Sequence, residues 1–135
     1  MGLPAMRRLA LAASLVALTA GCAAPPMPRE INEAVEGARV TLAREQELVV
    51  SLDGNQTTGF RWSLTRDALP ILVQIGDATY VPRQADGKLA GSGGLTTFRF
   101  RAVVAGSTSL GFSYRRPWEV NIPPLKTIRF EIRVE

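Results

Sequence analysis

Apolar and polar residues alternate along the chain from about residue 38 almost to its end. Val40 and Leu42, for example, alternate with Arg39 and Thr41. Successive side chains of a β-strand point to opposite faces, so this period of two predicts half-buried strands. The other apolar sets with this period are Leu48, Val50 and Leu52; Phe60, Trp62 and Leu64; Ile71, Val73 and Ile75; Phe98, Phe100, Ala102 and Val104; Leu110, Phe112 and Tyr114; and Ile128, Phe130, Ile132 and Val134.

Turn-forming residues separate these sets. They include Asp53-Gly54-Asn55, Ala105-Gly106-Ser107 and Pro123-Pro124. No long helical pattern follows the first twenty residues, although residues 31–37 are compatible with a short helical turn. Short strands at this spacing are typical of two packed sheets. We therefore predict an all-β domain over residues 38–135, an immunoglobulin-like antiparallel β-sandwich of about seven strands.

The N-terminal residues have the pattern of a secretory signal. Arg7 and Arg8 precede an almost wholly apolar run over residues 9–18. This run is too short to cross a bilayer, which takes about 20 residues. Residues 1–21 are therefore predicted to be a removable signal peptide of the lipoprotein type. Residues 22–37, which are rich in proline near their start, are predicted to be a tether that begins at a lipidated cysteine.

The end of this signal, Thr19-Ala20-Gly21-Cys22, resembles a bacterial lipobox, although Thr19 stands where that motif usually has leucine. The resemblance implies that Cys22 becomes a lipidated N-terminus. Ala23 is not the aspartate that, in Gram-negative lipoproteins, signals retention in the inner membrane. We therefore expect a lipid-anchored protein of the bacterial cell envelope, on the periplasmic side of the outer membrane. The alternative is a soluble periplasmic or secreted protein that is cleaved near Ala20.

The composition argues against an enzyme. The chain has no histidine and one cysteine, which excludes histidine-based catalytic triads, imidazole general bases and histidine-ligated metals. A single thiolate forms neither an intramolecular disulfide nor a zinc site. Candidate carboxylates such as Asp53, Asp67, Asp77 and Glu119 are scattered over turns, and no spacing brings two of them together. We expect no catalytic residue, no cofactor and no metal.

The charge does not favour a nucleic-acid partner. The chain has 16 basic and 12 acidic residues, and loss of Arg7 and Arg8 with the signal peptide leaves 14 against 12. The arginines at positions 99, 101, 129 and 133 alternate with apolar residues, which is typical of the solvated face of a strand. We expect no nucleic-acid binding, and we expect a monomer.

Three connections contain residues that a simple turn between strands does not need. The first, Asn55-Gln56-Thr57-Thr58-Gly59-Phe60, is longer than a tight hairpin requires. Its Gly59 can supply a positive φ just before the next strand. Trp62, which follows in that strand, is expected to be a core residue rather than a binding residue.

The second connection contains Gly91-Ser92-Gly93-Gly94, and the third contains Arg115-Arg116-Pro117-Trp118. The glycines do not match a dinucleotide-binding fingerprint because no helix follows them. Pro117 cannot donate a hydrogen bond to a strand ladder, so Trp118 is expected to lie in a loop with its indole partly exposed. An exposed tryptophan beside arginine has the composition of an interface hot spot. The alternative is a tryptophan that folds back over the end of the sandwich.

In this order, the motifs Asn-x-Thr-Thr-Gly-Phe-x-Trp, Gly-x-Gly-Gly and Arg-Pro-Trp resemble the chagasin family of protein inhibitors of papain-like cysteine peptidases. The resemblance spans residues 38–135. It implies a sandwich whose three loops line up at one end and enter the active-site cleft of the peptidase. The residues that it assigns to the peptidase-binding surface are Asn55, Gln56, Thr57, Thr58, Gly59 and Phe60 in the first loop, Gly91, Ser92, Gly93 and Gly94 in the second, and Arg116, Pro117 and Trp118 in the third.

One residue departs from the family pattern. Gln56 stands where the family usually has proline. Proline would stiffen the loop before binding, so glutamine is expected to raise the cost of ordering it by a few tenths to about 1 kcal/mol. The function that we predict is reversible, noncovalent inhibition, in which the loops fill the cleft without presenting a bond for cleavage. The alternative is an envelope lipoprotein that binds a glycan, or scaffolds other proteins, and has no inhibitory activity.

Overall fold

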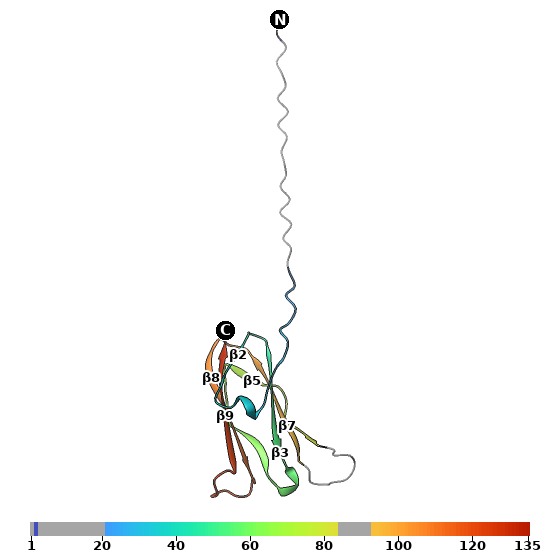
Figure 1. Ribbon diagram of the computed structural model, residues 1–135. Coiled ribbons are helices and arrows are strands. Elements are labelled where there is room, and N and C mark those ends of the chain that lie inside the picture. The colour runs from blue at the N-terminus through green and yellow to red at the C-terminus, as the bar shows by residue number, and fades with distance from the viewer. Residues whose placement is uncertain (1, 3–20, 84–92) are drawn as a thin grey trace.

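The computed structural model describes residue 2, residues 21–83 and residues 93–135. Within these residues it contains two packed sheets and two short 3₁₀ turns (Figure 1). Sheet A has the strand order β1-β3-β7-β5, and β6 also pairs with β7; sheet B has the order β2-β9-β8-β4. The elements are β1 (Arg29–Ile31), η1 (Glu33–Val35), β2 (Arg39–Leu42), β3 (Glu47–Gly54), η2 (Gln56–Thr58), β4 (Arg61–Arg66), β5 (Leu72–Gln74), β6 (Thr79–Pro82), β7 (Gly94–Ala102), β8 (Gly106–Arg115) and β9 (Lys126–Val134).

The predicted all-β sandwich is confirmed, and the structure adds two strands and two parallel pairings to it. The strands that the pattern missed are β1 and β6. Both are short, and neither alternates buried with exposed residues, so they carry no period-two signal. β1 runs parallel to β3, and β2 runs parallel to β9. The sheets are therefore mixed rather than purely antiparallel.

The fold takes in part of the segment that was expected to be a tether. β1 and η1 both lie within residues 22–37, and the Ile31 side chain is buried in the core. The Asn32 side chain caps η1 by accepting a hydrogen bond from the Ala34 N–H. A Glu33 carboxylate oxygen accepts one from the Asp53 N–H at the end of β3, and burial raises the pKa of this carboxyl. Among the described residues, the first strand therefore begins at Arg29, about nine residues before the predicted boundary.

Aromatic side chains from both sheets form the centre of the core. Phe98 and Phe100 of β7 pack against Phe112 of β8, with ring centroids 4.8 and 6.4 Å apart, and Phe130 of β9 lies 6.1 Å from Phe112. All four rings are buried. The apolar faces predicted for β7, β8 and β9 are therefore buried at these positions and give the sandwich a rigid interior.

The alternation predicted for β5 is wrong by one residue. Leu72 is buried and lies opposite the buried Ala102, whereas Val73 is exposed. Apolar residues occur at positions 69, 71, 72, 73 and 75, so the sequence contains two competing alternations. Pairing with β7 selects the one that places Leu72 in the core. Val104, predicted to extend the apolar face of β7, is exposed beyond the end of that strand.

The strand register places three connections at one end of the sandwich. Gly54, the last residue of β3, lies opposite Gly94, the first residue of β7, and Gly94 also lies opposite Pro82 at the end of β6. In sheet B, Arg61 at the start of β4 lies opposite Arg115 at the end of β8. The β3–β4, β6–β7 and β8–β9 connections therefore leave the sheets together. The C-terminus and residues 21–28 lie at the other end (Figure 1).

Candidate functional site

The three loops named from their motifs lie at this end of the sandwich. The first loop, residues 55–60, follows β3. The described part of the second loop consists of Gly93 and Gly94, and Gly94 is the first residue of β7. The third loop, residues 116–118, follows β8. We call these segments together the loop edge. Gly91 and Ser92, which were also assigned to the second loop, lie outside the described residues. The assignment of the loop edge to peptidase binding stays a prediction at this point.

The first loop is held in shape by its own hydrogen bonds. The Asn55 side-chain oxygen accepts from the Thr57 N–H (3.1 Å) and from the Thr57 hydroxyl (2.5 Å). The Thr58 hydroxyl donates to the Asn55 carbonyl oxygen (2.8 Å), and the Gly59 N–H donates to the Gln56 carbonyl oxygen (3.0 Å). Asn55 thus caps a single turn of 3₁₀ helix. Both threonine hydroxyl protons are used inside the loop, so these side chains have only oxygen lone pairs to offer a partner.

Gly59 ends this turn and is the point where the first and third loops touch. Its φ of 84° lies in the left-handed region, which favours glycine. A Cβ atom at this position would overlap Cη2 of the Trp118 indole and lie 3.1 Å from its Cζ2. The indole therefore rests directly on the Gly59 backbone, while two thirds of Trp118 stays exposed. This settles the two alternatives for Trp118: it lies against the first loop with its indole largely open to solvent.

Arg116 makes a second connection between the first and third loops. Its Nε donates to the Thr58 carbonyl oxygen (3.0 Å), and its guanidinium carbon lies 4.5 Å from the centre of the Phe60 ring. Its Nη1 also forms an ion pair with Glu119 (3.1 Å). Two contacts therefore join Arg116 to the first loop, and the ion pair with Glu119, within its own connection, also holds the guanidinium.

The second loop meets the base of the first loop. Gly93 has a φ of 83°, and a Cβ there would lie 3.2 Å from the Gly54 carbonyl oxygen. A Cβ at Gly94 would collide with the Val81 carbonyl oxygen. An ion pair between Arg83 and Asp53 also joins the end of β6 to the end of β3. Glycine is required here because the β3 and β6 backbones approach closely.

Two core aromatic residues connect the loop edge to the interior. Trp62 is buried, as predicted, and its Nε1 donates to the Asp53 carbonyl oxygen (2.8 Å). The buried Tyr114 hydroxyl accepts from the Asn55 N–H (2.7 Å) and donates to the Asn55 carbonyl oxygen (3.2 Å). The two rings pack 5.0 Å apart. Sequence analysis placed both in the core but missed that Tyr114 holds the first loop, because the pattern does not report hydroxyl contacts.

Tyr114→Phe is expected to lower the free energy of unfolding by about 1–2 kcal/mol, because it leaves the partly buried Asn55 N–H without its acceptor. The melting temperature should fall by several degrees. Thermal unfolding followed by circular dichroism measures this, with Tyr80→Phe, which removes a hydroxyl from β6, as the control. Equal melting temperatures for wild type and Tyr114→Phe would show that the hydroxyl does not hold the loop.

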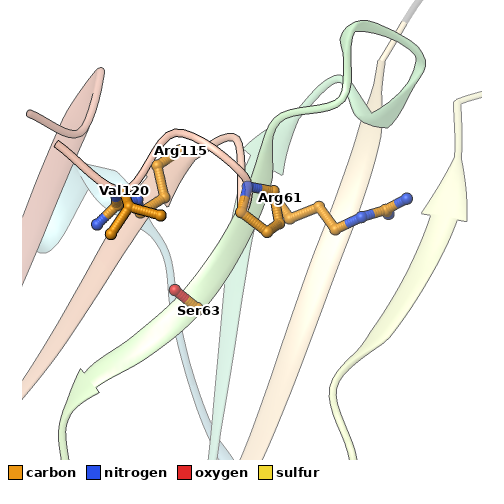
Figure 2. Close-up of a pocket in the computed structure, with 5 residues that line it drawn as sticks. Arg61, Ser63, Arg115 and Val120 are labelled. Carbon is orange, nitrogen blue, oxygen red and sulfur yellow. The ribbon is translucent and has the colours of Figure 1, made fainter. Parts of the chain in front are cut away.

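A shallow hollow of about 290 Å³ lies between β4 and the third loop (Figure 2). It is lined by Arg61, Ser63, Arg115, Pro117 and Val120. Arg115 donates a hydrogen bond to the Glu119 carbonyl oxygen, which closes the third loop on itself. Figure 2 shows Arg115 and Val120 on one side of the hollow, with the Arg61 side chain running out on the other.

Beyond the three motifs, the β8–β9 connection carries further large apolar side chains. Val120, Ile122 and Leu125 are each more than half exposed, like Trp118. Sequence analysis did not single them out. The signal that could have found them is the spacing of four large apolar residues within eight positions of a proline-rich loop that has no strand alternation.

The described residues contain no cluster of three or more histidine, cysteine, aspartate or glutamate side chains that could hold a metal ion. Among the same residues, no helix is long and apolar enough to span a membrane. What the site offers is shape, exposed backbone and a few oriented polar groups. This arrangement is typical of a protein that binds a partner through loops held at one end of a β-sandwich.

Comparison with known proteins gives the family. The model of the chagasin family of peptidase inhibitors, I42, matches residues 41–134, and the chain belongs to this family. Chagasin of Trypanosoma cruzi is 30% identical over 95 residues, which are 68% of this chain and 84% of that protein. The resemblance seen in the sequence is therefore confirmed.

Solved structures confirm the fold. The crystal structure of EhICP2, a cysteine protease inhibitor from Entamoeba histolytica, has a TM-score of 0.72 at 16% identity, over 81% of this chain and 96% of that chain. PbICP-C, solved in complex with falcipain-2, has a TM-score of 0.51 at 14% identity, over 81% of this chain and 92% of that chain. At these identities the likeness concerns the sandwich itself.

Proposed function

We propose that this protein is a reversible inhibitor of papain-like cysteine peptidases and that the loop edge enters the active-site cleft. The observation that carries the proposal is the set of contacts joining the loops: Trp118 on Gly59, Arg116 on Thr58, and Gly93 beside Gly54. These contacts order the edge before binding, so little conformational entropy remains to be lost in the complex. Membership of a peptidase-inhibitor family supports the same function.

The geometry of the loop edge favours a protein that blocks the cleft of a peptidase over one that catalyses a reaction. The turn Gln56–Thr58 contains no thiol, amine, imidazole or carboxylate, and its two threonine hydroxyls donate to Asn55. Thr57 and Thr58 are exposed at its tip, and their hydroxyl oxygens can accept hydrogen bonds from the catalytic groups of a peptidase. The flanking Trp118 supplies apolar area for the wall of a cleft. A loop that bonds to itself in this way does not present an extended backbone for cleavage.

The test is hydrolysis of a fluorogenic peptide by papain in the presence of increasing amounts of the purified protein. We expect saturating inhibition that is reversed by dilution, with the inhibitor chain intact by mass spectrometry after prolonged incubation. Trypsin, a serine peptidase, serves as the control and should keep its activity. Full papain turnover with excess folded protein would contradict the proposal and favour the noninhibitory binding module.

We also propose that Cys22 is lipidated and anchors the protein to the periplasmic face of the bacterial outer membrane. The support is the Ala20-Gly21-Cys22 sequence together with the exposed residues 21–28, which leave the sandwich at the end away from the loop edge (Figure 1). An anchor there would direct the loops away from the lipid. Mass spectrometry of the mature N-terminus tests this, and an unmodified thiol at Cys22 would contradict it.

A further inference from the structure

We propose that Gln56 determines specificity at the loop edge: Arg61 orients its side-chain amide so that the Nε2–H₂ group faces the partner and donates to an oxygen acceptor on the cleft wall. The inference rests on the proposed function, because the acceptor belongs to the bound peptidase. Gln56 stands where the family usually has proline, so the family pattern does not assign a role to this side chain.

The contact that orients the amide is a hydrogen bond from Arg61 Nη1 to Gln56 Oε1 (2.6 Å). A guanidinium has only donors, whereas an amide has one accepting atom and one donating atom. Arg61 therefore selects the amide orientation in which the oxygen faces β4. The two N–H donors of Gln56 are left on the other side of the group.

Arg61 is free to make this contact because of its position at the start of β4. It lies directly opposite Arg115 across the β4–β8 pair, and like charges in such a pair repel. Figure 2 shows the Arg61 side chain running away from Arg115 and Val120. Among the described residues, the ion pairs do not include Arg61. The oxygen of Gln56 is thus the acceptor that the structure provides for its charge.

The donors of Gln56 are available to a partner. No hydrogen bond from its Nε2 to another described residue is present, and the single buried polar side-chain atom without a partner in the described residues is Ser109 Oγ, not this nitrogen. The hydroxyl groups of Thr57 and Thr58 already donate hydrogen bonds to Asn55. Within the turn Gln56–Thr58, the Gln56 amide is therefore the side-chain donor left for recognition.

The partner chemistry follows from this arrangement. An amide N–H₂ on Gln56, the partly exposed first residue of the turn, fits an uncharged carbonyl oxygen or a carboxylate on the wall of the cleft, and it rejects a wall that offers only donors. The contact with Arg61 also changes the expectation that Gln56 leaves the first loop loose. The side chain is held to β4 in the free protein, so part of its ordering is complete before binding.

The variant that separates recognition from loop order is Gln56→Glu. It keeps the length of the side chain and turns the contact with Arg61 into an ion pair, but it removes both N–H donors. We expect the dissociation rate of the complex with papain to rise at least fivefold, with an unchanged melting temperature. Gln56→Met, which removes the donors and the Arg61 contact together, should weaken binding at least as much. The dissociation rates should be measured at high salt, because salt screens the repulsion between the new carboxylate at position 56 and distant charges of the peptidase.

Two results would overturn the inference. The first is a dissociation rate of Gln56→Glu equal to or lower than that of the wild type, which would assign Gln56 to loop order alone. The second comes from the NMR spectrum of the free protein, in which we expect Arg61→Met to shift the Gln56 side-chain amide resonances; unmoved resonances would show that Arg61 does not orient the amide. The control is Arg133→Met, on β9 opposite Ser107 at the far end of sheet B, which should not move them.

The NMR measurement on the free protein and the dissociation rate of the complex keep this inference distinct from the proposed function. The amide resonances are measured in the absence of a peptidase, so they decide the orienting role of Arg61 whatever the inhibition assay gives. If the wild type leaves papain fully active, the proposed function fails and recognition by Gln56 fails with it. If the wild type inhibits and Gln56→Glu inhibits equally, only the inference fails.

Discussion

Trp118→Ala is expected to raise the inhibition constant against papain about thirtyfold or more, which corresponds to about 2 kcal/mol of binding free energy. The indole is 66% exposed in the free protein and lies at the centre of contact between the first and third loops. Burying it against the cleft wall removes a large apolar surface from water. Because its contacts are with a loop and not with the core, the melting temperature should change little.

Val104→Ala provides the matched control for this prediction. Val104 is also an exposed apolar residue, but it lies between β7 and β8, at the end of the sandwich away from the loop edge. Its truncation should leave inhibition unchanged. An inhibition constant of Trp118→Ala equal to that of the wild type would remove the indole from the interface. A large fall in melting temperature would instead assign Trp118 to the stability of the fold.

The strands of the sandwich were predictable where apolar residues on one face alternate along the chain with polar residues on the other face. β3, β7 and β9 fulfil this condition, since each buries every second side chain over most of its length. β8 has the same alternation in its sequence but buries six consecutive residues, Ser109 to Tyr114. β5 did not, because both of its faces carry apolar residues and only its pairing with β7 decides between them. β1 and β6 are held by backbone pairing to longer strands, which leaves no trace in their side-chain pattern.

The loop edge was predictable as three motifs but not as a set of contacts. The order of the motifs gave the loops, and the strand register then brought them to one end. The hydrogen bonds of Tyr114 to Asn55, of Arg61 to Gln56 and of Arg116 to Thr58 join residues that lie five to 59 positions apart. Period and composition carry no information about such pairs, because their geometry depends on where the sheets place each backbone.

The same contacts explain how a small domain can hold a precise binding edge. Trp62 and Tyr114 are core residues by burial, yet their polar atoms bond to the backbone of Asp53 and Asn55. The apolar rings belong to the packed interior, and the N–H and O–H groups reach the base of the first loop. Core packing therefore sets the position of the loop, and a substitution in the core should alter binding as well as stability.

Gly59→Ala is expected to weaken inhibition at least tenfold, although it adds one methyl group. The new Cβ would occupy the position of the Trp118 ring edge, so the indole must leave its place. An alanine with a φ of 84° also carries about 1 kcal/mol of backbone strain. Displacement of Trp118 and distortion of the turn Gln56–Thr58 both reduce complementarity to a cleft, and both should appear in the inhibition constant.

Gly37→Ala separates the strain from the steric clash. Gly37 has a similar φ of 75°, but a Cβ there would meet no atom within 4 Å. It should lower the melting temperature and leave inhibition unchanged, whereas Gly59→Ala should affect both. In the double variant Gly59→Ala with Trp118→Ala, the clash is absent. The double variant should therefore lose less affinity than the sum of the losses of the two single variants. Strict additivity would mean that the first and third loops do not position each other, and the loop edge would then be three independent segments.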